Sequence, residues 1–326
     1  MPKAIVVREV GGPEKLAWED VPAPSPGPGQ AVVRHTAIGL NFIDVYNRTG
    51  LYKLPLPFVP GQEGAGVVEA VGEGVTDVAP GQRVAYMGAT GAYAEVRAIA
   101  AERLVPLPAG IEDRVAAAIM LKGMTAEYLL RRCAPVKAGD TILYHAAAGG
   151  VGLLACQWAR HLGARVIGTA GGPEKVKLAL AHGCEHVIDY DAVDAKGVVA
   201  RVKELTGGAG VPLVFDSVGA RTFQMSLDSL RPRGMLVSFG NASGPVPPFD
   251  PLILGGPRSL YFTRPSTAAY QSTRAELLAS AAALFDVVVS GAVKVNVNQT
   301  YALRDVATAH RDLEGRRTTG STVLLP

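Results

Sequence analysis

The sequence predicts an α/β protein in which a doubly wound parallel sheet domain is joined to a second, mostly β domain. Short β-like runs fill the first part of the chain, and strand-like and helix-like runs alternate from about residue 122 onward. The length of 326 residues points the same way, because at roughly 100 to 200 residues per domain it indicates two domains with substantial cores.

The N-terminal region consists of β-like runs separated by Gly, Pro, Asp and Asn. The runs are AIVVREV, AVVRHTAIGL, GAGVVEAVGEGV, RVAYMG and AYAEVRAIA. The Pro-rich stretch PAPSPGPG at 22–29 is short enough for a stiff connection between strands, so we do not expect a domain boundary there. The pattern indicates a small, mostly β domain.

Six strand-like runs alternate with helix-like runs in the second region: TILYH, RVIGT, HVIDY, LVFDSV, MLVSFG and SLYFT. Parallel neighbours need crossover connections, so this alternation predicts a parallel, doubly wound sheet. Gly163 and Gly183 suit positions just past helix ends, and Pro173 suits a first helical turn. Helices at about 273–289 and 303–313 and a final STVLLP strand then return to the first domain. The expected domains are 1–122 with 265–326, and 123–264.

Composition excludes several classes of protein. The 32 basic and 29 acidic side chains give a net charge of +3, which does not describe a dedicated partner of nucleic acid. Three cysteines, Cys133, Cys156 and Cys184, are too few for a disulfide scaffold and suit a reducing compartment. The start MPKAIVVREV is too short in apolar residues for the core of a signal peptide. We therefore expect a cytoplasmic protein that binds a small molecule, with neither nucleic acid nor a membrane as its main partner.

The segment TILYHAAAGGVGLLACQWARHLG at 141–163 predicts a dinucleotide-binding turn. Ala147, Gly149 and Gly152 occupy the three glycine positions of the fingerprint, which serve a tight turn, close approach to pyrophosphate, and close helix packing. The helix that follows offers free N–H groups to phosphates. A tight turn without a ligand is the alternative for any Gly-rich string. The strand-turn-helix setting at the head of six such units favours a Rossmann-type nucleotide-binding domain.

The end of the second strand-like run, RVIGTAGGPEKVK, distinguishes between nucleotides. An NAD site usually carries a carboxylate here for the ribose 2′-hydroxyl. Here Thr169, Gly171 and Gly172 leave space, and Lys175 follows as a cation that could meet a 2′-phosphate. We therefore expect NADPH as the cofactor. The alternative for Lys175 is an ordinary solvated helix residue.

The strings HTAIGLNFIDVYNRTGLY and VPGQEGAGVVEAVGEGVTDVAPGQRVA, followed by the turn above, resemble the medium-chain dehydrogenase/reductase superfamily over essentially the whole chain. The resemblance implies a GroES-like fold for the mostly β domain, which carries catalysis. In zinc alcohol dehydrogenases of that superfamily, a Cys before the first helix and a His in a PGHE-like turn hold a catalytic zinc. Here those positions read Asn41 and Gln62, which are not normal zinc ligands, and no Cys precedes Cys133. We therefore expect no metal.

Four further strings, NFIDVY, LKGMTAEYLL, HAAAGGVG and VSFGNASG, resemble the zinc-free NADPH:quinone oxidoreductase branch, the relatives of zeta-crystallin. Two later strings, SLYFTRPS and EGRRTTGSTVLLP, resemble the bacterial members of this branch. The resemblance implies a cofactor site that gathers residues from several motifs, with Arg317 as an alternative to Arg316. The expected cofactor-binding residues are Asn41, Tyr46, Thr125, Gly149, Gly150, Val151, Gly171, Lys175, Tyr190, Ser217, Ser238, Phe239, Gly240, Asn241, Phe262, Thr263 and Arg316.

The function implied is hydride transfer from NADPH to a quinone, which needs neither a metal nor a nucleophile because the cofactor carries the chemistry. Tyr46 and Tyr52 are the candidate catalytic residues, and Tyr52 is the candidate for substrate contact and proton donation. Packed aromatic side chains are the alternative for both. Two other functions stay open: reduction of an activated carbon–carbon double bond, and a cofactor-stabilised structural or RNA-binding role like that of crystallins. The resemblance also implies a homodimer formed through the region from MLVSFG to SLYFT.

Overall fold

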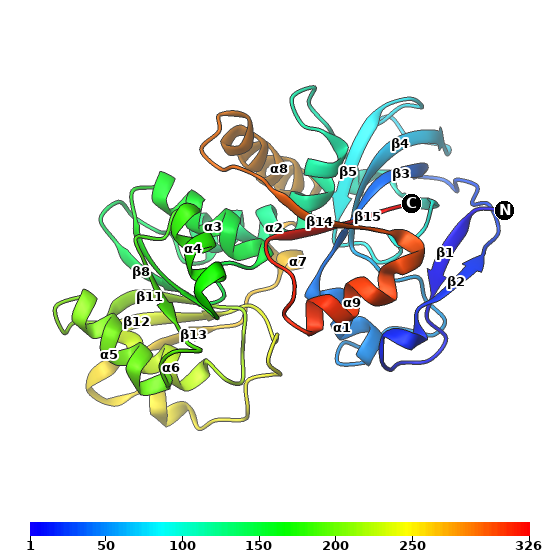
Figure 1. Cartoon of the computed structure of the whole chain (residues 1–326). Coiled ribbons are helices and arrows are strands. Elements are labelled where there is room, and N and C mark those ends of the chain that lie inside the picture. Colours follow the sequence, from blue (N-terminus) through cyan, green and yellow to red (C-terminus); the bar gives the residue numbers. More distant parts are fainter. The chain divides into compact units, whose positions relative to one another are not determined.

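The computed structural model describes all 326 residues, and the chain divides into two compact units (Figure 1). Unit 1 comprises Met1–Met124, Gln271–Val289 and Val295–Pro326, and unit 2 comprises Thr125–Tyr270 and Ser290–Lys294. The second unit therefore starts two residues after the expected domain boundary and also takes residues 265–270 and 290–294.

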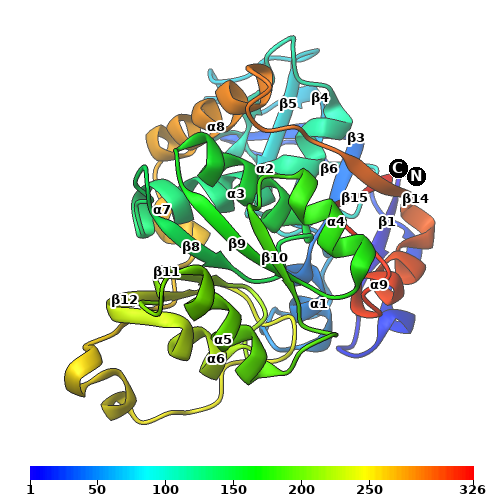
Figure 2. The same cartoon turned by 60° about the vertical axis from the view of Figure 1, so that its left-hand side comes forward.

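Unit 2 is built on a six-stranded parallel sheet whose strand order is β10-β9-β8-β11-β12-β13. The chain leaves β8 toward β9 and β10 and then crosses back to β11, so the order reverses between β8 and β11 (Figure 2). The predicted doubly wound sheet is confirmed. Its strands are β8 (Thr141–Tyr144), β9 (Arg165–Ala170), β10 (His186–Asp189), β11 (Val211–Asp216), β12 (Leu230–Ser238) and β13 (Tyr261–Thr263).

Helices cover both faces of this sheet, with α3 and α4 on one side and α5 and α6 on the other (Figure 1). Apolar residues of α5 and α6, such as Val198 and Leu227, share a buried cluster with Leu143, Val214 and Leu236 of the strands. Burial of these side chains, at roughly 25 cal/mol per Å² of apolar area, stabilises the unit. The helices are α3 (Gly150–His161), α4 (Pro173–Ala181), α5 (Ala195–Leu205), α6 (Phe223–Ser229) and α7 (Thr267–Tyr270).

The predicted helix boundaries follow from local backbone geometry. Gly163 and Gly183 have φ angles of 87° and 100°, a left-handed region that a side chain rarely tolerates, and each lies just beyond a helix end. Pro173 is the first residue of α4, where its missing N–H costs nothing.

Unit 1 contains a seven-stranded sheet with the order β14-β15-β3-β4-β5-β7, in which β6 also pairs with β3, and a separate β1-β2 hairpin. The C-terminal strand β15 lies between β14 and β3, so the end of the chain completes the N-terminal sheet. The strands are β1 (Lys3–Val6), β2 (Ala17–Asp20), β3 (Gln30–Leu40), β4 (Glu63–Val71), β5 (Arg83–Met87), β6 (Val96–Ala100), β7 (Val105–Pro106), β14 (Val297–Ala302) and β15 (Ser321–Leu325).

The helices of unit 1 come from both ends of the chain. They are α1 (Phe42–Thr49), α8 (Arg274–Val289), α9 (Val306–Glu314) and α2 (Asp113–Tyr128), whose last four residues belong to unit 2. The sequence analysis did not predict α2 or the polar strand β14. Strand β14 carries no alternating apolar pattern, and helix α9 separates it from its partner β15 in the sequence. No helix combines the length and the apolar composition needed to cross a bilayer.

Candidate functional site

The turn between β8 and α3 forms a cradle made almost entirely of backbone. Gly149 is the N-cap of α3, so the first N–H groups of that helix have no partners within it. A β-carbon on Gly152 would run into the carbonyl oxygens of Ala146 and Ala147. The left-handed residue of the turn is Ala146, with φ 54°, rather than Ala147, whose N–H donates to the Thr169 carbonyl. The geometry suits an anionic group placed at the start of α3.

The tip of the neighbouring strand β9 carries no carboxylate of its own. Gly171 and Gly172 follow the strand, and Gly172 has a φ of 85° with open space at its α-carbon. The N–H of Gly172 donates to Asp189 Oδ1 at 2.9 Å. The Asp189 carboxylate at the end of β10 therefore fixes the turn between β9 and α4. Lys175 lies half-buried in the first turns of α4, and Tyr190 directly follows β10.

The remaining predicted residues of unit 2, except Thr125, lie at or near the carboxyl ends of the later strands. Because all six strands are parallel, these ends share one edge of the sheet, where open α/β sheets bind ligands. Ser217 follows β11, and its backbone leaves no room for a β-carbon on Gly240, so these two turns touch. Phe262 packs its ring against Phe223 and Phe249, which is a core contact. Ser238 ends β12, Phe239 and Asn241 follow it, Thr263 ends β13, and Thr125 lies buried in α2.

A buried polar row at this edge was not predicted. His145 Nδ1 lies 2.9 Å from Thr169 Oγ1, and Asp216 is opposite Ser238 in the strand ladder. Burial lowers the pKa of His145 below its ordinary value, so its imidazole is neutral. The signal was present in the sequence, because in four of the strand-like runs a polar residue, His145, Thr169, Asp216 or Ser238, directly follows three or four mostly apolar residues. All four side chains are buried at this edge of the sheet.

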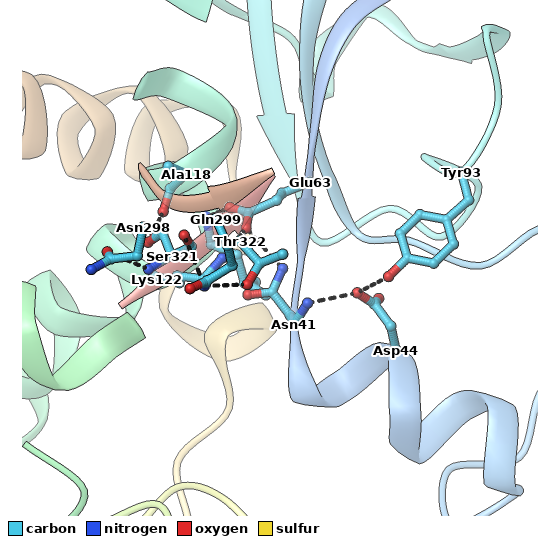
Figure 3. A network of polar contacts seen from close by, with 11 residues as sticks. Asn41, Asp44, Glu63, Tyr93, Ala118, Lys122, Asn298, Gln299, Ser321 and Thr322 are labelled. Atoms are coloured by element: carbon cyan, nitrogen blue, oxygen red, sulfur yellow. Dashed lines mark hydrogen bonds and ion pairs between the residues drawn. The ribbon is translucent and has the colours of Figure 1, made fainter. Parts of the chain in front are cut away.

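In unit 1, Asn41 is the N-cap of α1 and the centre of a buried polar network (Figure 3). Its Nδ2 donates to Glu63 Oε1 at 2.8 Å, and the same oxygen receives the Lys122 ammonium at 2.6 Å. Glu63 Oε2 accepts the N–H of Leu121 at 2.6 Å. Glu63 is fully buried and Lys122 only 5% exposed, so this ion pair is removed from solvent.

The backbone of Asn41 is held from the other side. Its N–H donates to Asp44 Oδ2 at 2.9 Å, and the Tyr93 hydroxyl donates to the same oxygen at 2.9 Å. Burial raises the pKa of Asp44 to about 7, with Glu63 adding to the rise, and also raises the pKa of Tyr93 well above its usual range. His310 contacts Tyr93 and Arg48, and its burial lowers its pKa to about 3.

The two candidate catalytic tyrosines lie together on unit 1. The rings of Tyr46 and Tyr52 meet edge to face with centroids 5.3 Å apart, and Phe42 lies 6.1 Å from Tyr46. Tyr46 is buried, while Tyr52 is 37% exposed. Tyr52 is therefore the candidate tyrosine that a flat ligand arriving from solvent could contact.

At the C-terminal end of unit 1, Arg316 and Arg317 lie just after helix α9. Arg317 pairs with Asp312 through Nε at 2.8 Å and Nη2 at 2.5 Å. Arg316 lies in the exposed turn after α9 with a φ of 60°.

Comparison with known proteins relates the two units to a single family. Residues 27–109 match the model of the alcohol dehydrogenase GroES-like domain, and residues 150–306 match that of the zinc-binding dehydrogenase family. The quinone oxidoreductase of Pseudomonas aeruginosa is 52% identical over 328 residues, with 100% of both chains covered. The chain belongs to the quinone oxidoreductase branch of the medium-chain dehydrogenase/reductase superfamily. The resemblance seen in the sequence motifs is thereby confirmed.

A solved structure and a further relative are also similar to this chain. The Escherichia coli quinone oxidoreductase complexed with NADPH is 46% identical and superimposes with a TM-score of 0.97, covering 99% of this chain and 100% of that chain. The 2-haloacrylate reductase of a Burkholderia species is 47% identical over 335 residues, covering 100% of this chain and 99% of that one.

The family model's description implies zinc, but the residues present do not fit that ion. Asn41 and Gln62 offer amides where the zinc enzymes have Cys and His, and the Lys122 ammonium shares an oxygen of Glu63 with Asn41. A dication beside a buried ammonium would be strongly repelled. Nowhere in the chain do three His, Cys, Asp or Glu side chains group closely enough to hold a metal ion.

Proposed function

We propose that this chain is an NADPH:quinone oxidoreductase that transfers a hydride from NADPH to a quinone without a metal ion. The observation that supports it most is the backbone cradle between β8 and α3, at the point where the strand order of the sheet reverses. NADPH supplies the hydride when bound, and one proton is taken up, so a quinone becomes a hydroquinone and NADP⁺ remains. The protein has to bind NADPH and the quinone, orient them toward each other, and exclude water from the reacting atoms.

The phosphate end of the cofactor is assigned to unit 2 and the tail of unit 1. Gly150 and Val151 offer N–H groups to the pyrophosphate at the start of α3. Gly149, whose own N–H donates to the Ala146 carbonyl, lets the pyrophosphate approach the backbone closely. In this proposal Gly171, Lys175 and Tyr190 of unit 2 bind the 2′-phosphate. Arg316 of unit 1 is a further cation for it, with Arg317 as the alternative. Charge-assisted hydrogen bonds are worth about 1.5 to 3 kcal/mol each, enough to prefer NADPH over NADH.

The nicotinamide end is assigned to two sets of residues. The first is the edge of the sheet in unit 2, and the second is the N-terminus of α1 in unit 1 with its fixed Asn41 amide. Thr125 contacts the ribose or the phosphates in this proposal. The edge set is Ser217, Ser238, Phe239, Gly240, Asn241, Phe262 and Thr263.

The aromatic group of unit 1 is proposed to receive the quinone. Tyr46 and Tyr52 present ring edges and hydroxyls, and the partial exposure of Tyr52 allows it to contact a ligand that enters from solvent. Tyr52 either donates the proton that completes the hydroquinone or orders a water that does so.

A second candidate is reduction of an activated carbon–carbon double bond. It is favoured by the 2-haloacrylate reductase that is 47% identical to this chain, since the same hydride delivery serves an alkene conjugated to a carboxylate. The two candidates share the cofactor and differ only in the substrate.

The proposed assembly is a cytoplasmic homodimer formed through strand β13. This edge strand of the six-stranded sheet exposes Tyr261 at 57%, and the nearby Leu252 is 81% exposed. An uncovered apolar edge invites pairing with another chain. Sedimentation of the Tyr261→Lys variant should show a monomer, and an unchanged dimer would remove β13 from the interface.

The test of function is NADPH oxidation with three acceptors, a benzoquinone, an enone and 2-chloroacrylate, each with and without a strong chelator. We expect turnover with the quinone that the chelator does not reduce. Turnover with 2-chloroacrylate alone would establish the second candidate instead. Loss of activity on chelation would contradict the metal-free mechanism.

A further inference from the structure

The ion pair between Glu63 and Lys122 is part of a larger hydrogen-bond network that includes Asn41. The Glu63 carboxylate accepts three donors, from Lys122, from the backbone of Leu121 and from the Asn41 amide (Figure 3). Gly39 makes room for it, because a β-carbon there would overlap the carboxylate and the Ala117 carbonyl oxygen. A substitution at Gly39 would therefore displace the carboxylate from its three donors.

The carboxylate decides which way the Asn41 amide points. An ionised carboxylate only accepts hydrogen bonds, so the NH₂ group of Asn41 must face Glu63. The carbonyl oxygen Oδ1 faces the other way, toward the backbone N–H of Asp44, which it accepts in the capping box of α1. The backbone of the same residue is fixed by its N–H bond to Asp44. Asn41 is therefore held at its backbone and at its side chain, and Oδ1 keeps a second lone pair in a defined direction.

A buried ion pair is a poor way to gain stability, because desolvation offsets most of the attraction and an apolar replacement often does as well. A second ion pair joins the same helix to the same sheet without touching Asn41. It links Arg83 of β5 to Asp113 of α2 at 2.5 Å, and both side chains are partly exposed. Fastening α2 to the sheet therefore does not require a buried pair at Glu63.

We propose that Glu63 and Lys122 are positioning residues that orient the Asn41 amide, so that Oδ1 accepts a hydrogen bond from the nicotinamide half of NADPH. The inference rests on the proposed function. The donor is an N–H or O–H group, which the carboxamide and the adjoining ribose both carry.

The experiment is a cycle of three variants, Asn41→Ala, the charge-free pair Glu63→Gln with Lys122→Met, and all three changes together. Both charges are removed at once because a lone buried charge could unfold the protein. A lost hydrogen bond of ordinary strength corresponds to roughly a three- to ten-fold rise in the KM for NADPH. We expect this rise for Asn41→Ala and for the pair, and no further rise when the changes are combined.

The matched control is Arg83→Met with Asp113→Asn, which removes the other ion pair of α2. It should lower the denaturation midpoint and leave the KM for NADPH unchanged. The inference is overturned if the Glu63 and Lys122 pair behaves like this control, or if its effect multiplies with that of Asn41→Ala.

Two further measurements identify the donor and separate this inference from the proposed function. The reduced acetylpyridine analogue of NADPH lacks the carboxamide N–H, so an effect of the pair that disappears with this analogue assigns the donor to the carboxamide, and one that persists assigns it to the ribose. If the wild-type protein binds NADPH but reduces no quinone, the proposed function fails. NADPH fluorescence titrations of the same variants then decide the positioning role by the same criterion of non-additivity.

Discussion

The cradle of unit 2 and the Asn41 network of unit 1 are two ways of building a rigid site. The cradle is a short contiguous turn whose working groups are backbone N–H groups and the absent side chains of glycines. The network consists of side chains from distant parts of the chain, with Glu63 and Lys122 separated by 59 positions and Arg48 and His310 by 262. The cradle requires the absence of side chains, and the network requires paired charges. An added β-carbon should therefore disrupt the cradle, and the loss of one charge should disrupt the network.

The largest effect is expected from removing one charge of the network. Lys122→Met leaves the fully buried Glu63 carboxylate without its cation. Breaking a buried pair in this way costs about 3 to 5 kcal/mol of unfolding free energy. Urea denaturation should show this loss for the single variant and recovery of most of it when Glu63→Gln is added. A single variant as stable as the wild type would mean that the ion pair is not desolvated.

The next largest effect is expected from the protonation of Asp44, which belongs to the Asn41 network. Burial raises the pKa of Asp44 from 3.8 to about 7, so between these values the folded protein holds a proton that the unfolded chain has released. Stability from this group is therefore present at low pH and is lost as pH rises toward 7.

Asp44→Asn removes that loss while keeping an oxygen for the Asn41 N–H and the Tyr93 hydroxyl. Relative to the wild type, the variant should gain about 1.4 kcal/mol per pH unit between pH 5 and 7. The buried His35 and His310, whose pKa values are lowered to about 4 and about 3, act in the opposite direction but are common to both proteins. Urea denaturation of both proteins at pH 5, 6, 7 and 8 measures the difference, and parallel stability profiles would contradict the assignment.

A smaller effect is expected in the cradle, where space rather than charge is decisive. The β-carbon of Gly152→Ala would collide with two backbone carbonyls, which overpacks the turn and costs about 1 to 3 kcal/mol. Gly149→Ala is the matched variant, since its β-carbon would lie 3.1 Å from the Ala146 oxygen. Thermal denaturation should separate the two, with Gly152→Ala destabilised and Gly149→Ala close to the wild type. Similar stabilities would mean that the turn adjusts freely.

The same contrast explains what could be predicted from the sequence. Helix ends depend on local backbone conformation, so the sequence predicted the roles of Gly163, Gly183 and Pro173. It also predicted the strand-turn-helix setting of the cradle. The partners of Asn41 were hidden, because nothing near Glu63 or Lys122 in the sequence indicates that they meet. Asn41 and Tyr46 were found only through family resemblance, and strand β14 was missed because its partner lies beyond a helix and a turn.

The most direct measurement is the dissociation constants of NADPH and NADH, side by side, for the wild type and for Lys175→Ala. The account assigns the 2′-phosphate to Lys175 in the first turn of α4, so the wild type should bind NADPH at least ten-fold more tightly than NADH. The substitution should weaken NADPH by about ten-fold and leave NADH unchanged. Equal weakening of both cofactors, or a wild type that prefers NADH, would contradict the account.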